Sequence, residues 1–372
     1  MNQTRQGYLL VADITGYTMF LSQSELEHAQ EILGTLLELL IQHTRPPLQI
    51  SRLAGDAVIS YALQGSALHG QTFVELIEDT YVAFRRAIEL MVLNNHCRCN
   101  ACANIAALDL KFFVHYGTFA IQHLSAHDEL VGNDVNLLHR LLKNRVTEQT
   151  GIRAYTLYTN TALQQLGLEG MCEGMRGHEE RYEHLGEIQL WLQDMHPIWE
   201  ERKSIAHLTI PPDQVSLQVA ADIAMPPHQV WGYLGQPEFR SILMGADRQV
   251  ILNRRHGRIA PGTVFQCFHG NRMTTQTLLV WQPFEQMTSQ DLTPVPSTYV
   301  LTNLLLNPTE TGTRLVQQFS KSNGPWWGRL LCDFALRTMA KGAQRDIDSF
   351  KAHIEADLAT RTHAPSSAST LG

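Results

Sequence analysis

Two aspartates, each beside a run of apolar residues, constrain this chain more than any other feature. Asp13 follows the apolar run 8–12, and Asp56 follows Gly55 within a predicted hairpin over residues 50–61. Carboxylates on neighbouring strand ends repel each other, so a close pair favours a bound cation or a raised pKa. Mg²⁺ takes oxygen ligands, usually one or two carboxylates plus phosphates. The sequence therefore predicts a divalent-cation site, and a helix cap at Asp13 with a turn residue at Asp56 is the alternative interpretation.

A third segment, residues 132–142, predicts a helix with two polar residues on one face. Asn136 and Arg140 are four positions apart, the spacing that places side chains on the same side of a helix. The buried stripe of this helix is expected to consist of Val135, Leu138 and Leu142.

Four blocks in order resemble the catalytic domain of class III nucleotidyl cyclases over roughly residues 5–195. They are Asp13 with Gly16-Tyr17-Thr18, Gly55-Asp56, the strand 112–117, and Val135-Asn136 with Arg140. The resemblance implies a ferredoxin-like α/β sandwich, which belongs to the α+β class. It also implies a possible adenylate or guanylate cyclase, a phosphorus-oxygen lyase of cyclic-nucleotide signalling.

The resemblance assigns a role to each residue of these blocks. Asp13, Asp56 and the main-chain carbonyl of Ile14 would hold two Mg²⁺ or Mn²⁺ ions while the ribose 3′-hydroxyl of ATP or GTP attacks the α-phosphorus. Asn136 would orient the ribose, and Arg140 would stabilise charge on the phosphate oxygens. In the family the last two come from the partner subunit, which implies a homodimer with shared sites.

Two further positions bear on the choice of purine. Adenylyl-type members place a lysine four residues before the Gly-Asp aspartate, where this chain has Arg52. They place an aspartate seven residues before the asparagine, where this chain has Glu129. Because the arginine fork needs different partners from a lysine ammonium, the resemblance leaves ATP and GTP open. Solvated surface charges are the alternative interpretation of both residues.

A short segment rich in cysteine predicts a second metal site. His96, Cys97, Cys99 and Cys102 lie within seven residues and offer four ligands to a tetrahedral zinc ion. Cys172 or another imidazole is the alternative to His96 as fourth ligand, and a set of free thiols is the alternative to a metal. Zinc here is expected to be structural or regulatory, because the cluster lies outside the cyclase pattern.

Helical spacing predicts two long helices in the first half of the chain. Their apolar stripes are Leu26, Ala29, Leu33, Leu36 and Leu40 in the first, and Phe73, Ile77, Tyr81, Phe84, Ile88 and Met91 in the second.

The second half of the chain has a different pattern. A strand over 215–223, a short helix, strand-like runs from 248 to 320 and a long helix over 326–357 resemble the START-like (SRPBCC, polyketide cyclase and lipid-transport) helix-grip family. That family implies an antiparallel sheet around the last helix and a small hydrophobic ligand. The candidate cavity lining is Trp231, Phe265, Phe268, Trp281, Trp326 and Phe334, and the predicted buried stripe of the last helix is Leu331, Ala335, Met339, Ala343, Ile347, Phe350 and Ile354.

Length and charge limit the classes of function. We expect a cyclase-like domain over 1–197, a linker over 198–212, a START-like domain over 213–357 and a disordered tail over 358–372. The net charge of -7 gives no electrostatic case for nucleic-acid binding. With no signal-peptide pattern, no apolar run long enough to span a membrane and only six cysteines, a cytoplasmic protein with reduced thiols is expected.

Three functions fit these observations. The first is a nucleotidyl cyclase, regulated by an apolar ligand of the C-terminal domain. The second is a cyclase-fold module that binds a nucleotide without cyclising it. The third is a carrier or sensor of a hydrophobic small molecule.

Overall fold

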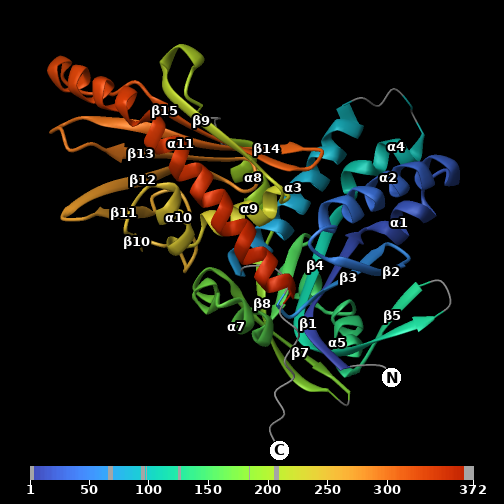
Figure 1. Cartoon of the computed structure of the whole chain (residues 1–372). Coiled ribbons are helices and arrows are strands. Elements are labelled where there is room, and N and C mark those ends of the chain that lie inside the picture. The colour runs from blue at the N-terminus through green and yellow to red at the C-terminus, as the bar shows by residue number, and fades with distance from the viewer. Residues whose placement is uncertain are drawn as a thin grey trace, which may run out of the picture. The chain divides into compact units, whose positions relative to one another are not determined.

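The chain forms two compact units in a computed structural model. One consists of Met1–Ser66 and Phe73–Ile205, and the other of Ala67–Thr72 and Ala206–Gly372. The structure describes residues 4–65, 70–93, 97, 99–124, 127–183, 185–204 and 209–363. The α+β class predicted from the sequence is confirmed, with one sheet in each half of the chain (Figure 1).

The first half builds an eight-stranded sheet. Its path is β2-β3-β1-β4-β6-β8-β7, with β5 paired to β4 off this path, and β4 and β6 are its parallel pair. The elements are β1 (Thr4–Thr15), α1 (Tyr17–Ser22), α2 (Leu26–Thr44), β2 (Gln49–Ala54), β3 (Ala57–Leu63), α3 (Gly70–Leu93), α4 (Asn100–Asn104), η1 (Ile105–Ala107), β4 (Asp109–Leu124), β5 (His127–Val131), α5 (Asn133–Leu141), α6 (Val146–Thr150), β6 (Tyr155–Thr159), α7 (Asn160–Leu166), η2 (Glu169–Gly174), β7 (Arg176–Tyr182), β8 (Gly186–Asp194) and α8 (His196–Ser204).

Strand β1 is buried on both faces, as a central strand must be. Side chains of successive residues point to opposite faces. The ring of Tyr8 lies 5.2 Å from that of Phe73 in α3, whereas Leu9 and Val11 join the core cluster that contains Leu138 of α5. Helices α3 and α5 therefore cover opposite faces, and Asp13, which shares the parity of Leu9 and Val11, projects on the α5 side.

Most of the predicted helical stripes are buried. Ala29, Leu33, Leu36 and Leu40 of α2 are buried, as are Phe73, Ile77, Tyr81, Phe84 and Ile88 of α3. Two residues differ: Leu26 opens the first turn of α2 and is 62% exposed, and Met91 near the end of α3 is only half-buried. The 3.6-residue period identified these helices because each has one face toward the sheet.

The second half builds a seven-stranded antiparallel sheet in the order β10-β11-β12-β13-β14-β15-β9. The predicted architecture of antiparallel strands and a long final helix is confirmed. Its elements are η3 (Pro212–Gln214), β9 (Val215–Ile223), α9 (Pro227–Leu234), α10 (Pro237–Leu243), β10 (Arg248–Leu252), β11 (Val264–His269), β12 (Arg272–Gln282), β13 (Gln286–Leu292), β14 (Tyr299–Thr309), β15 (Gly312–Ser320) and α11 (Trp326–His363).

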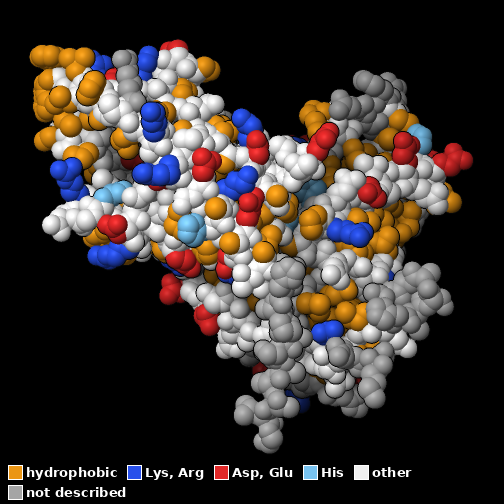
Figure 2. All heavy atoms as spheres, in the orientation of Figure 1, with side chains coloured by type: hydrophobic (Ala, Val, Ile, Leu, Met, Phe, Trp, Pro, Cys, Tyr) orange, Lys and Arg blue, Asp and Glu red, His pale blue; other side chains and the backbone are white. Residues whose placement is uncertain are grey.

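The predicted packing of the first half of α11 is wrong. Ile347, Phe350 and Ile354 are fully buried, but Leu331 and Met339 are 59% and 52% exposed. In the first half of α11 the buried residues are Cys332 and Leu336 instead. Hydrophobic side chains gather on the surface at this end of the helix (Figure 2). Apolar residues occupy both faces there, so periodicity could not identify the buried one.

The predicted cavity lining is therefore also wrong in part. Trp231, Phe265 and Trp281 are buried, and the rings of Trp231 and Trp281 lie 4.3 Å apart, tilted by 50°. Trp326 and Phe334 are 69% and 72% exposed, so neither lines an enclosed cavity.

Among the helices that the structure describes, none has both the length and the apolar composition needed to cross a bilayer.

The contact between β4 and α5 generates a stability prediction. Gly117 in β4 lies against Asp134, whose Oδ2 accepts a 2.6 Å hydrogen bond from the main-chain nitrogen of Thr118. A methyl group on Gly117 would overlap the Asp134 carboxylate. Gly117→Ala should lower the free energy of unfolding in urea by about 1–3 kcal/mol, because overpacking displaces the anchor of α5.

Gly34→Ala is the matched control. Gly34 lies on the exposed side of α2 with nothing near its missing methyl group, so this variant should gain about 0.5–1 kcal/mol. Equal stability changes in the two variants would show that the Asp134 contact does not constrain the strand.

Candidate functional site

The structure brings Asp13 and Asp56 together at one end of the first sheet. Asp13 pairs in register with Ala57 of β3 on one side and with Lys111 of β4 on the other. Asp56 occupies the two-residue turn before β3, and its carbonyl accepts a 3.2 Å hydrogen bond from the main-chain nitrogen of Ile14. Backbone pairing thus fixes both carboxylates on adjoining chain segments.

Burial and mutual repulsion disfavour ionisation of this pair. Burial, followed by the charge of Asp56, raises the pKa of Asp13 to about 6, and burial also raises the pKa of Asp56. The charge of Lys111 acts in the opposite direction on both groups. A cation added here would relieve the remaining repulsion.

Lys111 is a site residue that the sequence analysis missed. Its Nζ lies 5.6 Å from the ring centre of Tyr155, the residue that pairs with it on β6. Burial lowers the pKa of Lys111, while the nearby Asp13 raises it. The signal in the sequence was a lysine directly before the apolar run 112–114 of β4.

Helix α5 carries the two polar residues on its outer side. Val135 and Leu138 are buried against the sheet, whereas Asn136 and Arg140 are exposed. Gly132, just before the helix, packs against Thr118. Thr118 follows Lys111 by seven residues on β4, which is about 23 Å at the rise of a β-strand. The start of α5 therefore lies well away from the carboxylates.

Arg52 and Glu129, the predicted purine-reading positions, form an ion pair with each other. The Nη2 of Arg52 also lies 3.0 Å from Nε2 of His139 on α5. Burial and the charge of Arg52 lower the pKa of His139, so its neutral ring can accept this hydrogen bond. His139 was not predicted, although it lies between Asn136 and Arg140 in the sequence.

The donor set at Asp13 and Asp56 fits a hard divalent cation. Two carboxylates and the main-chain carbonyl of Ile14, one residue beyond Asp13, are oxygen ligands of the kind that Mg²⁺ and Mn²⁺ prefer. Burial and the charge of Asp56 raise the pKa of Asp13, and a cation bound by both carboxylates would offset that repulsion.

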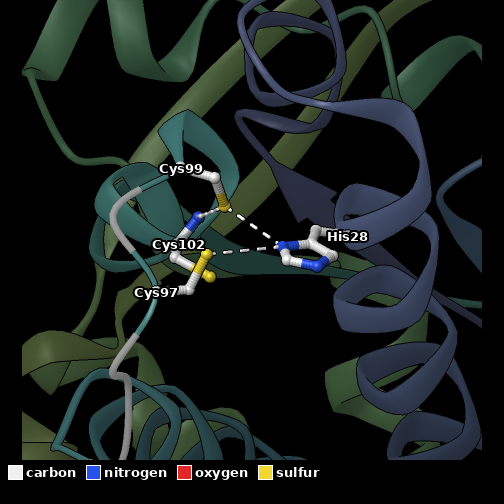
Figure 3. A group of neighbouring side chains, drawn as sticks. All are labelled: His28, Cys97, Cys99 and Cys102. Atoms are coloured by element: carbon white, nitrogen blue, oxygen red, sulfur yellow. Dashed lines mark hydrogen bonds between the residues drawn. The ribbon is translucent and has the colours of Figure 1, made fainter.

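The cysteine segment forms a cluster, with a different imidazole from the one expected. The ligand atoms of Cys97, Cys99, Cys102 and His28 lie within 4.8 Å of one another (Figure 3). His28 comes from the first turns of α2, about seventy residues earlier in the chain. The predicted ligand His96 lies outside the described residues.

Two family models match parts of the chain. Residues 214–355 match the family described as polyketide cyclase / dehydrase and lipid transport, as the sequence resemblance predicts. Residues 33–150 match a family described as a protein of unknown function, DUF2652. An uncharacterized protein from Mycobacterium tuberculosis is 29% identical over 134 residues, which are 36% of this chain and 60% of that protein.

Solved structures of nucleotidyl cyclases are similar to about half of the chain. The adenylyl cyclase CyaB from P. aeruginosa is 14% identical, with a TM-score of 0.40 over 52% of this chain and 95% of that one. The guanylyl cyclase Cya2 is 15% identical, with a TM-score of 0.38 over 51% of this chain and 92% of that one.

The electrostatics of Asp13 generate a pH-dependent stability prediction. In buffer without Mg²⁺ or Mn²⁺, Asp13→Asn should stabilise the protein at pH 7.5 by roughly 2–3 kcal/mol, because the folded state then holds no disfavoured charge. The folded pKa is above the ordinary value of 3.8, so the native state binds more protons between pH 3.8 and about 6. The gain should therefore shrink as the pH falls through this range and vanish below it.

Unfolding measured across this pH range tests the prediction. Glu148→Gln, at an exposed carboxylate of the same unit, should change stability by less than about 0.5 kcal/mol at every pH. A gain for Asp13→Asn that does not depend on pH would contradict the assigned cause.

Proposed function

We propose that the N-terminal unit is a nucleotidyl cyclase domain that converts a purine nucleoside triphosphate to a cyclic nucleotide and pyrophosphate. The observation that carries this proposal is the Asp13–Asp56 pair, fixed side by side by backbone pairing, with the pKa of Asp13 raised to about 6. Carboxylates held at such a cost are typical of sites that bind a cation or transfer a proton.

The side chains have separate tasks in this reaction. Asp13 and Asp56, with the carbonyl of Ile14, hold the cations, and Lys111 favours the ionised form of both carboxylates. When bound, Mg²⁺ or Mn²⁺ activates the ribose 3′-hydroxyl and neutralises charge on the triphosphate.

The bond changes in the reaction balance without a further reactant. The 3′-oxygen bonds to the α-phosphorus, the bond from that phosphorus to its bridging oxygen breaks, and pyrophosphate leaves. The hydroxyl proton passes to solvent. Asn136 orients the ribose by hydrogen bonding, and the Arg140 guanidinium stabilises charge on the α-phosphate oxygens.

Purine recognition is assigned to the Arg52–Glu129–His139 group. These side chains offer a guanidinium fork, a carboxylate and an imidazole at the edge of α5, the helix that bears Asn136 and Arg140. The mutual ion pair of Arg52 and Glu129 is only partly buried, so its rearrangement around a base costs little.

The proposal predicts the effect of removing either carboxylate. Incubation of the purified full chain with ATP or GTP and Mn²⁺ should give cyclic nucleotide and an equal amount of pyrophosphate. Asp13→Asn and Asp56→Asn should each lower the rate by at least about 10²-fold, because each removes charge that the transition state requires. Asp222→Asn, at an exposed residue paired with Arg314, should be unaffected.

Each failure of this experiment has a distinct meaning. Mn²⁺-dependent nucleotide binding without product would replace the cyclase by a nucleotide-binding module. A wild-type chain that neither binds nor converts a nucleotide would overturn the proposal for this unit.

The exposed face of α5 predicts sharing of sites between two subunits. Because Asn136 and Arg140 face solvent, they are suited to reach the Asp13–Asp56 pair of a second chain. Co-expressed Asp13→Asn and Arg140→Ala chains should then recover activity, although each alone is inactive. Random pairing gives about one quarter of wild-type activity, since half of the dimers are mixed and each has one intact site.

The double variant Asp13→Asn/Arg140→Ala, co-expressed with wild-type chain, controls for altered subunit mixing. In that pairing both changes lie in one chain, and they disable both shared sites of the mixed dimer. Absence of recovery in the first mixture, with mixed dimers present by mass, would place all site residues in one subunit.

A further inference from the structure

We infer that His28, Cys97, Cys99 and Cys102 form a zinc site that ties helix α2 to the segment preceding β4. The inference is independent of the proposed cyclase activity. The four ligand atoms belong to two regions far apart in sequence, and the fold brings them within 4.8 Å of one another.

The distances in the cluster are close to those that a tetrahedral zinc ion imposes. Zn–S and Zn–N bonds of about 2.3 and 2.0 Å place neighbouring ligand atoms roughly 3.5–3.8 Å apart. Nδ1 of His28 lies 3.2 Å from Sγ of Cys99 and 3.8 Å from Sγ of Cys97. The same nitrogen points toward both sulfurs (Figure 3), so it can serve as ligand without a change of rotamer.

The segments that carry the ligands are fixed by contacts of their own. The carboxylate of Glu25, just before α2, accepts hydrogen bonds from the main-chain nitrogen of Ala101 at 3.1 Å and from the side chain of Asn100 at 3.3 Å. The sulfur of Cys99 accepts from the nitrogen of Cys102 at 3.4 Å. These contacts hold the start of α4, with Cys99 and Cys102, against the start of α2, with His28.

The chemistry of the cluster selects its ligand. Three sulfurs and one imidazole are soft to borderline donors, which suit zinc and exclude Mg²⁺ or Mn²⁺. His28 and Cys97 are exposed while Cys99 and Cys102 are half-buried, so an ion can enter from solvent. With all four positions taken by protein, the site has the closed ligand set of a structural zinc.

The location indicates what the ion stabilises. Cys102 precedes η1, whose Ala107 carbonyl accepts a 2.8 Å hydrogen bond from Arg153, and then β4 with Lys111. A zinc ion bound here would therefore fix the segment that leads into β4, the strand that pairs with β1 at Asp13. Its removal should loosen α2 and this entry segment first.

Metal analysis of the purified full chain tests the inference. Wild-type protein should contain about one zinc per chain, and protein loaded with Co²⁺ should show the visible absorption of a tetrahedral thiolate site. His28→Ala and Cys99→Ser should lose stoichiometric zinc, while His28→Cys should retain it and change the Co²⁺ spectrum. Glu25→Gln should weaken zinc affinity by about 10–100-fold, as loss of a supporting contact does.

Matched controls separate this site from general effects on folding. His43→Ala removes another imidazole of α2, and Cys172→Ser removes another half-buried thiol. Both variants should still bind zinc. A chelator should lower the melting temperature of the wild type but not of a folded Cys99→Ser chain. Full zinc content in His28→Ala, or a wild type without metal and with three freely titrating thiols, would overturn the site.

Discussion

The N-terminal unit depends on keeping two aspartates close together against their electrostatic repulsion. Two independent backbone connections do this: the β1–β3 ladder that pairs Asp13 with Ala57, and the hydrogen bond from Ile14 to the carbonyl of Asp56. Neither connection involves the carboxylate groups, so the backbone alone sets their separation. The cost appears in the raised pKa values, and the surrounding buried ladder supplies the stability that offsets it.

Lys111 limits how strongly the proposed site would bind cations. It faces Asp13 across the β1–β4 ladder, and its charge reduces the net charge of the group from -2 to -1 when all three are ionised. The two carboxylates therefore attract a free cation less strongly with the charged Lys111 beside them than they would without it. The proposed site is better suited to a cation that arrives with a triphosphate, because the ammonium then interacts with the added negative charge as well.

The sequence predicted what depends on local pattern and missed what depends on distant contacts. The helical stripes of α2 and α3 and the strands of the second sheet each repeat apolar residues along one segment, so their periods identified them. Lys111 and His139 matter because of neighbours on other elements. The cysteine segment shows both cases: spacing identified the thiols, but His28 lies some seventy residues away, where no local pattern connects it to them.

The two candidate metal sites of this unit differ in ligand chemistry enough to be filled separately. Oxygen donors at Asp13 and Asp56 favour Mg²⁺ or Mn²⁺, whereas the thiolates of the cysteine cluster favour zinc. A zinc ion at the cluster would require deprotonated sulfurs. Zinc binding would therefore release a proton from each thiol that is protonated beforehand. Exchange of Mg²⁺ or Mn²⁺ at the carboxylates would involve no thiol, so a zinc ion that connects α2 to the segment before β4 would stay in place while the ions at the carboxylates exchange.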